Sequence, residues 1–221
     1  MGKDYLRGWR VGAKKYGLRI VAEETFKRGS IDLASQVLNL KKSRANYVFM
    51  GAATPSAVAT LQEAYKLGYH PQIIADVGGG ASKVIDVAQE AAKGLLVLIN
   101  TSSPEEDSPG MRELKEITKK YQPDIRIDGV YLWGWLGYSV GIEGLKRAGK
   151  NLTREGLIDS LETFKGRPFN TRGLSGDIVY SSKSHKGGGS LRIFRADMKK
   201  GVFVPFTDWM RPSIEEPIKM R

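Results

Sequence analysis

The sequence predicts an α/β fold built on a parallel, doubly wound sheet. From residue 19 to residue 100, short apolar runs of strand length alternate with segments of helical periodicity. The runs are continuously apolar, as in strands that are covered on both faces. Strand–helix–strand units of this length also suit the right-handed crossovers of a parallel sheet.

The chain opens on a predicted helix. In "MGKDYLRGWRVGAKKYG", Tyr5, Trp9, Ala13 and Tyr16 recur at spacings of four and three residues, which is the apolar stripe of an amphipathic helix. A strand normally comes first in a domain of this class. The sequence therefore raises the question of why no strand precedes this helix.

The alternation then continues through four predicted strands and three helices. Ser30 and Asp32 offer capping groups for the first of these helices, whose expected apolar face is Ile31, Ala34, Val37 and Leu38. Pro55 in the first turn and Gly68 at the end frame the second. The predicted strands are 19–26, 46–51, 71–76 and 94–100. The second helix is predicted at 55–69, and the segment 78–93 is predicted to be a loop followed by the third helix.

The second half of the chain has a different character. The segment "TSSPEEDSPG" (101–110) suits a crossing between domains, in which the acidic side chains are expected to be solvated. Two or three helices follow, and Thr153 can cap the last, whose dipole Glu155 complements. These helices are predicted at 109–121, 129–148 and 153–165, and strands at 176–182, 190–197 and 201–209, joined by the turns "KSHKGGG" and "MKKG".

Composition argues against several classes of function. The net charge is +11, but the basic residues occur singly or in pairs along predicted helices, so solvated helix faces explain it better than nucleic-acid binding. Cys is absent, and His70 and His185 are the only histidines. We therefore expect no metal, no cofactor and no thiol chemistry. No Ser lies in the strand–turn–helix setting of a hydrolase nucleophile.

The sharpest local signal is the glycine-rich loop "ADVGGGAS" (75–82) between a predicted strand and a helix. Its amides could meet an anion, although its spacing fits neither the dinucleotide fingerprint nor the P-loop. A plain crossover between strand and helix is the alternative. In open α/β sheets, ligands gather at the carboxyl ends of strands, where both this loop and "GAATPS" (51–56) lie. A binding crevice without catalytic groups is the natural reading.

The order of these pieces resembles the type I periplasmic binding proteins, specifically the branched-chain amino-acid (leucine/isoleucine/valine) receptors of ABC transporters. The resemblance runs over nearly the whole chain. The motifs that carry it are the stretch from "GKDYLRGWRVGAKKYG" to "ANYVFMG", the capped helix "RAGKNLTREGLIDSLETFKG", and the late strand and hairpin "GLSGDIVYSSKSHKGGGSLRIFRA".

The resemblance implies two hinged α/β lobes that close on a small ligand. Residues 1–104 would be most of the second lobe, 105–200 the C-terminal part of the first, and 201–221 a return crossing and tail. The family's opening half and the strand before residue 1 would be missing, so the chain would begin inside a domain. That strand should lie between 19–26 and 46–51. We expect a partner chain, a swapped segment or an N-terminal half to fill the gap.

The resemblance also implies a ligand site. Ala53, followed by Thr54, stands where members often carry an aromatic residue, and Met1 corresponds to an aromatic contact. The position of an acidic group for the ligand's ammonium is close to Val77, with Asp76 adjacent. All of these positions depart from the pattern of the amino-acid receptors. The implied ligand-binding residues are Ala53, Thr54, Asp76, Val77, Gly78 and Met1.

The expected function is capture of a small polar ligand for an ABC importer, with a branched-chain amino acid as the leading candidate. The expected location is the periplasm or the cell surface, and the expected partner is an ABC permease. A cytoplasmic sensor domain of the same fold, for an amide or an amino acid, is the alternative. A third hypothesis is an enzyme that acts on a phosphorylated substrate, which predicts that Asp76→Asn abolishes turnover.

Overall fold

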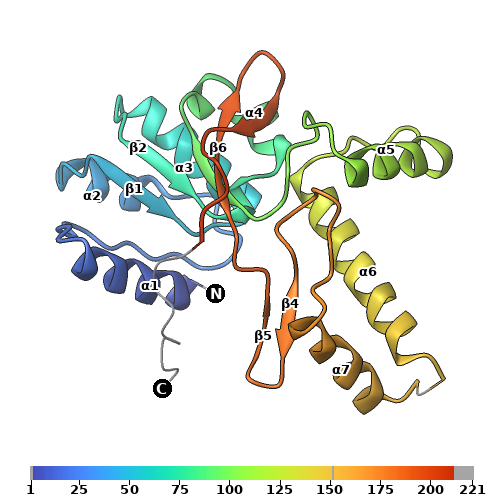
Figure 1. Ribbon diagram of the computed structural model, residues 1–221. Coiled ribbons are helices and arrows are strands. Elements are labelled where there is room, and N and C mark those ends of the chain that lie inside the picture. The colour runs from blue at the N-terminus through green and yellow to red at the C-terminus, as the bar shows by residue number, and fades with distance from the viewer. Residues whose placement is uncertain (1, 151, 212–221) are drawn as a thin grey trace. The chain divides into compact units, whose positions relative to one another are not determined.

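The computed structural model describes residues 2–150 and 152–211. These residues form two compact units, each described here by itself (Figure 1). The first unit contains residues 2–98 and 193–206. The second contains residues 99–150, 152–192 and 207–211.

A five-stranded sheet is the centre of the first unit, with the strand order β1-β2-β3-β6-β7. The first three strands run parallel, as the sequence predicts, and β6 and β7 form an antiparallel hairpin that joins the same sheet. The bounds are Tyr47–Met50 for β1, Gln72–Ala75 for β2, Leu96–Ile99 for β3, Arg192–Asp197 for β6 and Val202–Pro205 for β7.

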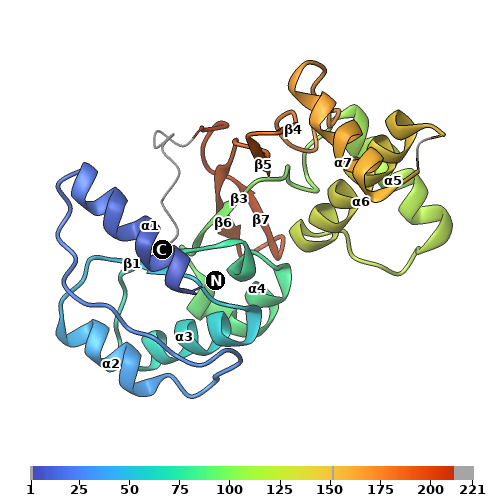
Figure 2. The ribbon, with the colours of Figure 1, turned by 90° about the horizontal axis from the view of Figure 1, so that it is seen from below.

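The helices of this unit lie on both sides of the sheet. Because α3 and α4 join strands that are added in the same direction, right-handed crossovers bring them to one face, and they pack on each other. The opening helix α1 lies on the other side of β1 from α2 and α3 (Figure 2). The bounds are Gly2–Lys15 for α1, Ala34–Lys42 for α2, Thr54–Lys66 for α3 and Ser82–Ala88 for α4, with short 3-10 turns at Val77–Gly79 and Gln89–Ala92.

The predicted strand at 19–26 is not formed. This segment has no ladder partner and is drawn without an arrow in Figure 1. Side chains hold it instead: the Arg10 guanidinium pairs with the Glu23 carboxylate, and Phe26 packs against the buried pair of Leu33 and Val37. A strand is stable only beside another strand, and none of the described residues supplies the neighbour that this segment requires.

The second helix also departs from its predicted form. It begins at Ala34, whose N–H donates to Oδ1 of the predicted capping residue Asp32 at 3.5 Å, and Leu33 and Val37 are its buried contacts with α3. Ile31 and Leu38, which were expected on the buried face, are exposed. Packing against α3 selects the buried face, and the apolar pattern of so short a helix does not determine that choice.

The strand β1 forms one edge of the sheet. The carbonyls of Asn46 and Met50 accept hydrogen bonds from the N–H groups of Gln72 in β2 and of Asp76 directly after it, and Val48 and Met50 are buried. In a parallel ladder the alternate residues direct their N–H and C=O groups to the other side. Those of Tyr47 and Phe49 therefore face an edge at which no strand of the described chain pairs.

The second unit is built from three helices. Pro109–Tyr121 forms α5, Gly129–Ala148 forms α6 and Arg154–Glu162 forms α7, close to the predicted ranges. Each begins on a side-chain cap, from Ser108, Asp128 and the predicted Thr153, whose Oγ1 accepts from the Gly156 N–H at 2.9 Å. The core is the buried cluster Met111, Leu114, Leu132 and Leu174.

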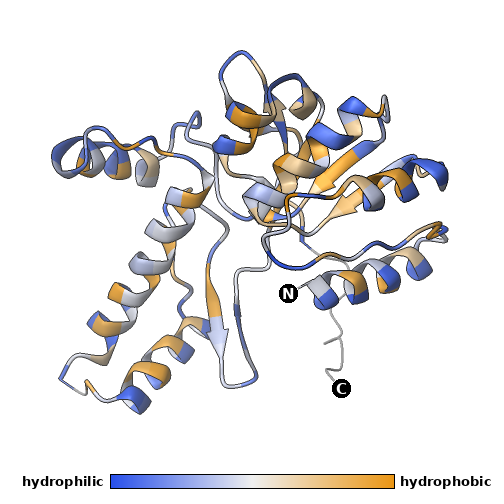
Figure 3. Ribbon diagram, turned by 180° about the vertical axis from the view of Figure 1, so that it is seen from behind, coloured by the Kyte–Doolittle hydropathy of each residue, from blue (hydrophilic) through white to orange (hydrophobic). Residues whose placement is uncertain are grey.

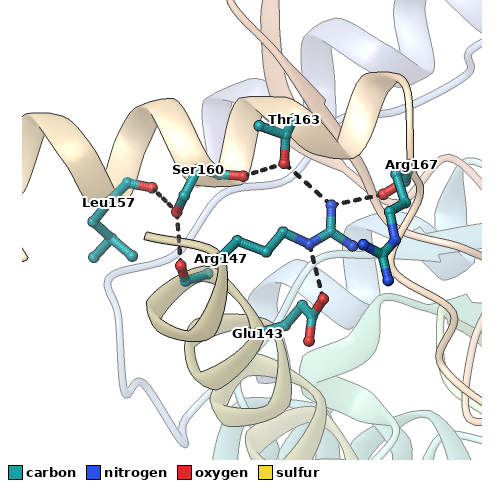
Figure 4. A network of polar contacts seen from close by, with 7 residues as sticks. Glu143, Arg147, Leu157, Ser160, Thr163 and Arg167 are labelled. Atoms are coloured by element: carbon teal, nitrogen blue, oxygen red, sulfur yellow. Dashed lines mark hydrogen bonds and ion pairs between the residues drawn. The ribbon is translucent and has the colours of Figure 1, made fainter. Parts of the chain in front are cut away.

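Helices α6 and α7 cross closely at Gly144, where a Cβ atom would lie 2.7 Å from a methyl carbon of Leu161. The Ser160 hydroxyl bonds the Gly144 carbonyl at 2.7 Å. Next to this contact, Arg147 donates to Glu143 at 2.8 Å, to the Thr163 hydroxyl at 3.1 Å and to the Arg167 carbonyl at 2.8 Å (Figure 4). One cation of α6 thus binds the chain that follows α7.

Two short strands complete the second unit as an antiparallel hairpin. Val179–Ser181 forms β4, inside the predicted strand at 176–182, whereas Ser184–Gly187 forms β5 in the segment expected to be a turn. The acidic segment is also not simply solvated. Glu106 Oε1 pairs with Arg192 at 2.6 Å and its Oε2 accepts from the Ser103 N–H at 2.7 Å. The arginine that makes this pair is distant in sequence, so local composition could not reveal it.

Candidate ligand-binding site

A buried carboxyl group lies at the carboxyl end of β2. The side chain of Asp76 directly follows that strand, and the residue is only 5% exposed. Its Oδ1 accepts hydrogen bonds from the Ala52 N–H at 3.3 Å and the Gly78 N–H at 3.2 Å, which ties together the loops after β1 and β2. Its Oδ2 is buried and has no hydrogen-bond partner among the described residues. A buried acceptor left in this state is costly, and such a group is a candidate ligand contact.

The glycine-rich loop is shaped by close packing. A Cβ atom on Gly78 would lie 2.4 Å from the Ala52 carbonyl oxygen, and one on Gly79 would lie 2.5 Å from the Ala75 Cβ. The amides of the loop are used internally, because Gly79 and Gly80 bond carbonyls of their own turn and Gly78 bonds Asp76. A loop that already binds a carboxylate is poorly suited to a phosphate.

The loop after β1 leads directly into α3. Ala53 precedes the helix, no side chain caps the first turn, and Pro55 is the second residue of the helix. The Thr54 hydroxyl donates to the Gly78 carbonyl at 3.1 Å, a second link between the two loops. The uncapped end of this helix of 13 residues favours negative charge.

Tyr5 of α1 belongs to the same region, although its place in the apolar stripe of the helix predicts only packing. Its ring lies over Gly51, where a Cβ would be 2.7 Å from the ring. Partial burial and the nearby Asp76 carboxylate raise the pKa of the Tyr5 hydroxyl to about 12. The spacing of Tyr5 and Trp9 indicated a contact face, and Trp9 does stack on Phe49 at 4.0 Å between ring centroids. Only the fold shows that Tyr5 reaches the carboxyl group.

The structure thus brings together most of the residues expected at a ligand site. Thr54, Asp76 and Gly78 are joined by hydrogen bonds, and Ala53 and Val77 are their chain neighbours. Met1 lies outside the described residues. In the second unit, the hydroxyls of Thr101 and Ser102 are buried without a partner among the described residues. No motif marks these two hydroxyls, so they could not be identified from the sequence.

Within the described part of the chain, no group of three potential metal ligands comes together. No helix in residues 2–150 and 152–211 has the length and apolar character that a bilayer crossing requires.

Comparison with known sequences gives a consistent result. The family model described as "Periplasmic binding protein" matches residues 1–201. A "Leu/Ile/Val-binding protein homolog 7" from Brucella abortus is 29% identical over 144 residues, which are 61% of this chain and 35% of the relative. A "Leu/Ile/Val/Thr-binding protein" from Salmonella typhimurium is 28% identical over 96 residues, or 43% of this chain and 26% of the relative.

Solved structures agree on the fold. A branched-chain amino-acid ABC transporter protein from Thermus thermophilus, with bound valine, superposes with a TM-score of 0.79 at 25% identity, covering 92% of this chain and 56% of that one. A fatty-acid ABC transporter substrate-binding protein from Thermomonospora curvata gives 0.84 at 23% identity, covering 94% and 54%, and shows the fold alone.

These similarities cover only part of each relative. The chain spans about a third of the length of the Brucella relative and about half of the solved chains. The family comprises the substrate-binding proteins of ABC transporters, which are not enzymes. Because the family model matches nearly the whole length of the chain, the chain belongs to the periplasmic binding protein family.

Proposed function

We propose that this chain is the main part of one ligand-binding lobe, and part of the other, of a solute-binding protein that serves an ABC importer. The family and its relatives support a solute-binding role. The observation that carries the proposal is the buried Asp76 carboxyl group with its unsatisfied Oδ2.

The chemistry of the site favours a zwitterionic ligand of the amino-acid class. The free carboxylate oxygen of Asp76 suits a cationic nitrogen. The uncapped start of α3 at Ala53 and Thr54 suits a carboxylate. An α-amino acid carries both groups a short distance apart, and a branched-chain amino acid is the leading candidate, in keeping with the names of the relatives.

Calorimetric titration tests this proposal on the protein together with any coding sequence that precedes it at its genomic locus. The ligands are leucine and its two one-charge analogues, 4-methylpentanoate and isoamylamine. We expect leucine to bind most tightly. Asp76→Asn should weaken leucine binding at least about tenfold, corresponding to about 1.4 kcal/mol, and should barely change binding of 4-methylpentanoate.

The matched control is Asp86→Asn, which removes an exposed carboxylate of α4 and should leave all three affinities unchanged. Equal leucine affinity in Asp76→Asn and the unaltered protein would contradict the assignment of Asp76. No binding of leucine, valine, amides or aromatic acids would contradict the solute-binding role itself.

The proposed partners follow from the family and from the sheet. An ABC permease is the partner that a solute-binding protein serves. The corresponding location is the periplasm or the cell surface. We further propose that the open edge of β1 is completed by a strand from an N-terminal half, a swapped segment or a second chain. Unpaired strand edges are costly, and here the edge-facing groups of Tyr47 and Phe49 support the proposal.

A further inference from the structure

A groove with a volume of about 600 Å³ lies at the amino ends of β2 and β3 in the first unit. Its lining comes from the end of α3, from the turn that leads into β2 and from the turn between α4 and β3. Asp76 directly follows the carboxyl end of β2, so the groove and the candidate ligand site lie at opposite ends of one strand. A volume of this size is within the range of pockets that hold small molecules.

The two walls of the groove are fixed by side-chain hydrogen bonds. Gly94 has a φ of +80°, which a residue with a side chain would adopt only under strain, and its carbonyl accepts from the Gln72 side-chain amide at 2.9 Å. On the other wall, the Tyr69 hydroxyl donates to the Ala45 carbonyl at 3.0 Å. The groove is therefore formed by the folded unit itself and needs no ligand to shape it.

The deepest part of the lining is apolar. Leu61 and Ala64 of α3, Ile73 of β2 and Leu95 before β3 all line the groove and are buried. In Figure 3 the arrows of β1 and β2 have the hydrophobic colours, so the apolar interior of the unit continues to the groove. An apolar floor of this kind favours a ligand with an apolar body.

An aromatic pair lines the groove beside this floor. The Tyr65 ring lies edge-to-face with the His70 ring at 6.3 Å between centroids, and the tyrosine is 54% exposed. Aromatic rings in this arrangement leave faces and edges available for a third ring. The pair therefore favours a planar, aromatic ligand body over an aliphatic one.

Two opposite charges belong to the same lining. Glu90 lies in the short turn after α4 and Lys93 directly follows that turn, and both residues are exposed. Within residues 2–150 and 152–211, neither side chain forms an ion pair or a hydrogen bond. The groove thus offers one cation and one anion that the described chain does not neutralise, which suits a ligand that carries both charges.

We propose that this groove, defined by Tyr65, His70, Ile73, Glu90 and Lys93, binds a small aromatic zwitterion of the class of the aromatic amino acids. The ligand ring lies on the apolar floor beside Tyr65 and His70. The Lys93 ammonium pairs with the ligand carboxylate, and the Glu90 carboxylate pairs with the ligand ammonium. The groove is separate from Asp76, and its occupancy does not depend on the proposed function.

The probe is L-tryptophan, added up to its solubility limit to the isotope-labelled protein, prepared as for the leucine titration. Two-dimensional NMR spectra of the backbone amides report where it binds. We expect the amide signals of His70 and Gly94 to shift in a saturable way. Ala91→Trp fills the groove and should weaken this binding at least about tenfold.

Two further variants test the charges separately and preserve the fold, because both residues are exposed. Lys93→Gln should weaken tryptophan and indole-3-propionate about threefold and leave tryptamine, which has no carboxylate, unchanged. Glu90→Gln should weaken tryptophan and tryptamine about threefold and leave indole-3-propionate, which has no ammonium, unchanged. The matched control is Lys83→Gln, at an exposed lysine of α4 outside the groove lining, which should leave all three affinities unchanged.

Three results would overturn the proposal. They are His70 and Gly94 signals that tryptophan does not shift, shifts that all three groove variants leave unchanged, and shifts that Asp76→Asn abolishes. The last result would assign tryptophan to the site at the other end of β2. Leucine binding that depends on Asp76 is a separate readout, so failure here and failure of the proposed function are distinguishable.

Discussion

At the scale of single residues, the site depends on contacts that join two loops and a helix. Asp76 accepts hydrogen bonds from the Ala52 and Gly78 amides, and the phenol of Tyr5 in α1 lies near its carboxylate. The sequence placed Asp76 at the end of a strand, because strand ends can be read from local pattern. It did not place Tyr5 there, because that contact spans about 70 positions of the chain and depends on where α1 packs.

The raised pKa of Tyr5 leads to a pH-dependent stability. The folded state favours the neutral phenol, since its pKa is about 12 against an ordinary value of 10.0. The resulting stabilisation is complete below pH 10 and is lost as the pH rises towards 12. Urea unfolding across this interval should show that Tyr5→Phe loses less stability with rising pH than the unaltered protein does. Tyr121→Phe, at an exposed tyrosine, should follow the unaltered protein; if Tyr5→Phe does so too, the pKa of Tyr5 is not raised in the folded state.

At the scale of elements, local patterning predicted the helices better than the strands. The helices α1, α3, α5, α6 and α7 begin and end near their predicted positions, since periodicity, prolines and caps are local signals. The segment 19–26 has strand composition but no strand, and β5 lies where a turn was expected. Strands need partners, and partners are determined by the tertiary structure.

The α6–α7 junction should depend on Arg147, whose side chain is only 14% exposed and stacks over the Phe164 ring at 4.3 Å. Arg147→Met keeps most of the packing but leaves Glu143 and the Arg167 carbonyl without their donor. We expect a loss of about 2 kcal/mol in the free energy of unfolding, measured by urea denaturation.

Arg112→Met is the comparison, because the Arg112–Asp107 pair is exposed and should contribute less than about 1 kcal/mol. Equal losses in the two variants would show that Arg147 acts only as a surface residue.

At the scale of the whole molecule, two surfaces lack a partner within the described chain: the backbone edge of β1 and the exposed apolar face of α6 with Tyr138, Ile142 and Leu145. One belongs to each compact unit. Both are expected of a chain that matches only about half of its solved relatives. The open β1 edge also agrees with the vacancy that the sequence resemblance placed next to residues 46–51.

The β1 edge can be tested with Tyr47→Pro. The Tyr47 N–H faces the open edge, and its side chain is 63% exposed, so proline there should preserve the ladder with β2. It should, however, abolish pairing of any added strand. We expect the variant to lose self-association, or binding of the N-terminal half, in light scattering and pull-down measurements while its circular dichroism is unchanged.

Ile74→Pro is the contrasting variant, since it lies in the parallel ladder with β1 and β3 and should unfold the first unit. Unaltered assembly of Tyr47→Pro would mean that the edge of β1 is not the place where a strand is added.

The sequence by itself determined the α/β class, most helix positions, the parallel strands β1 to β3 and the two loops that meet at Asp76. These follow from apolar periodicity, turn residues and strand-end position, all of which are local. The tertiary structure alone decided that β6 and β7 join the same sheet, that 19–26 remains unpaired, that Glu106 binds Arg192 and that one side of α6 is left uncovered. These features depend on which distant segments are available to pair and pack, and the local sequence pattern does not identify those segments.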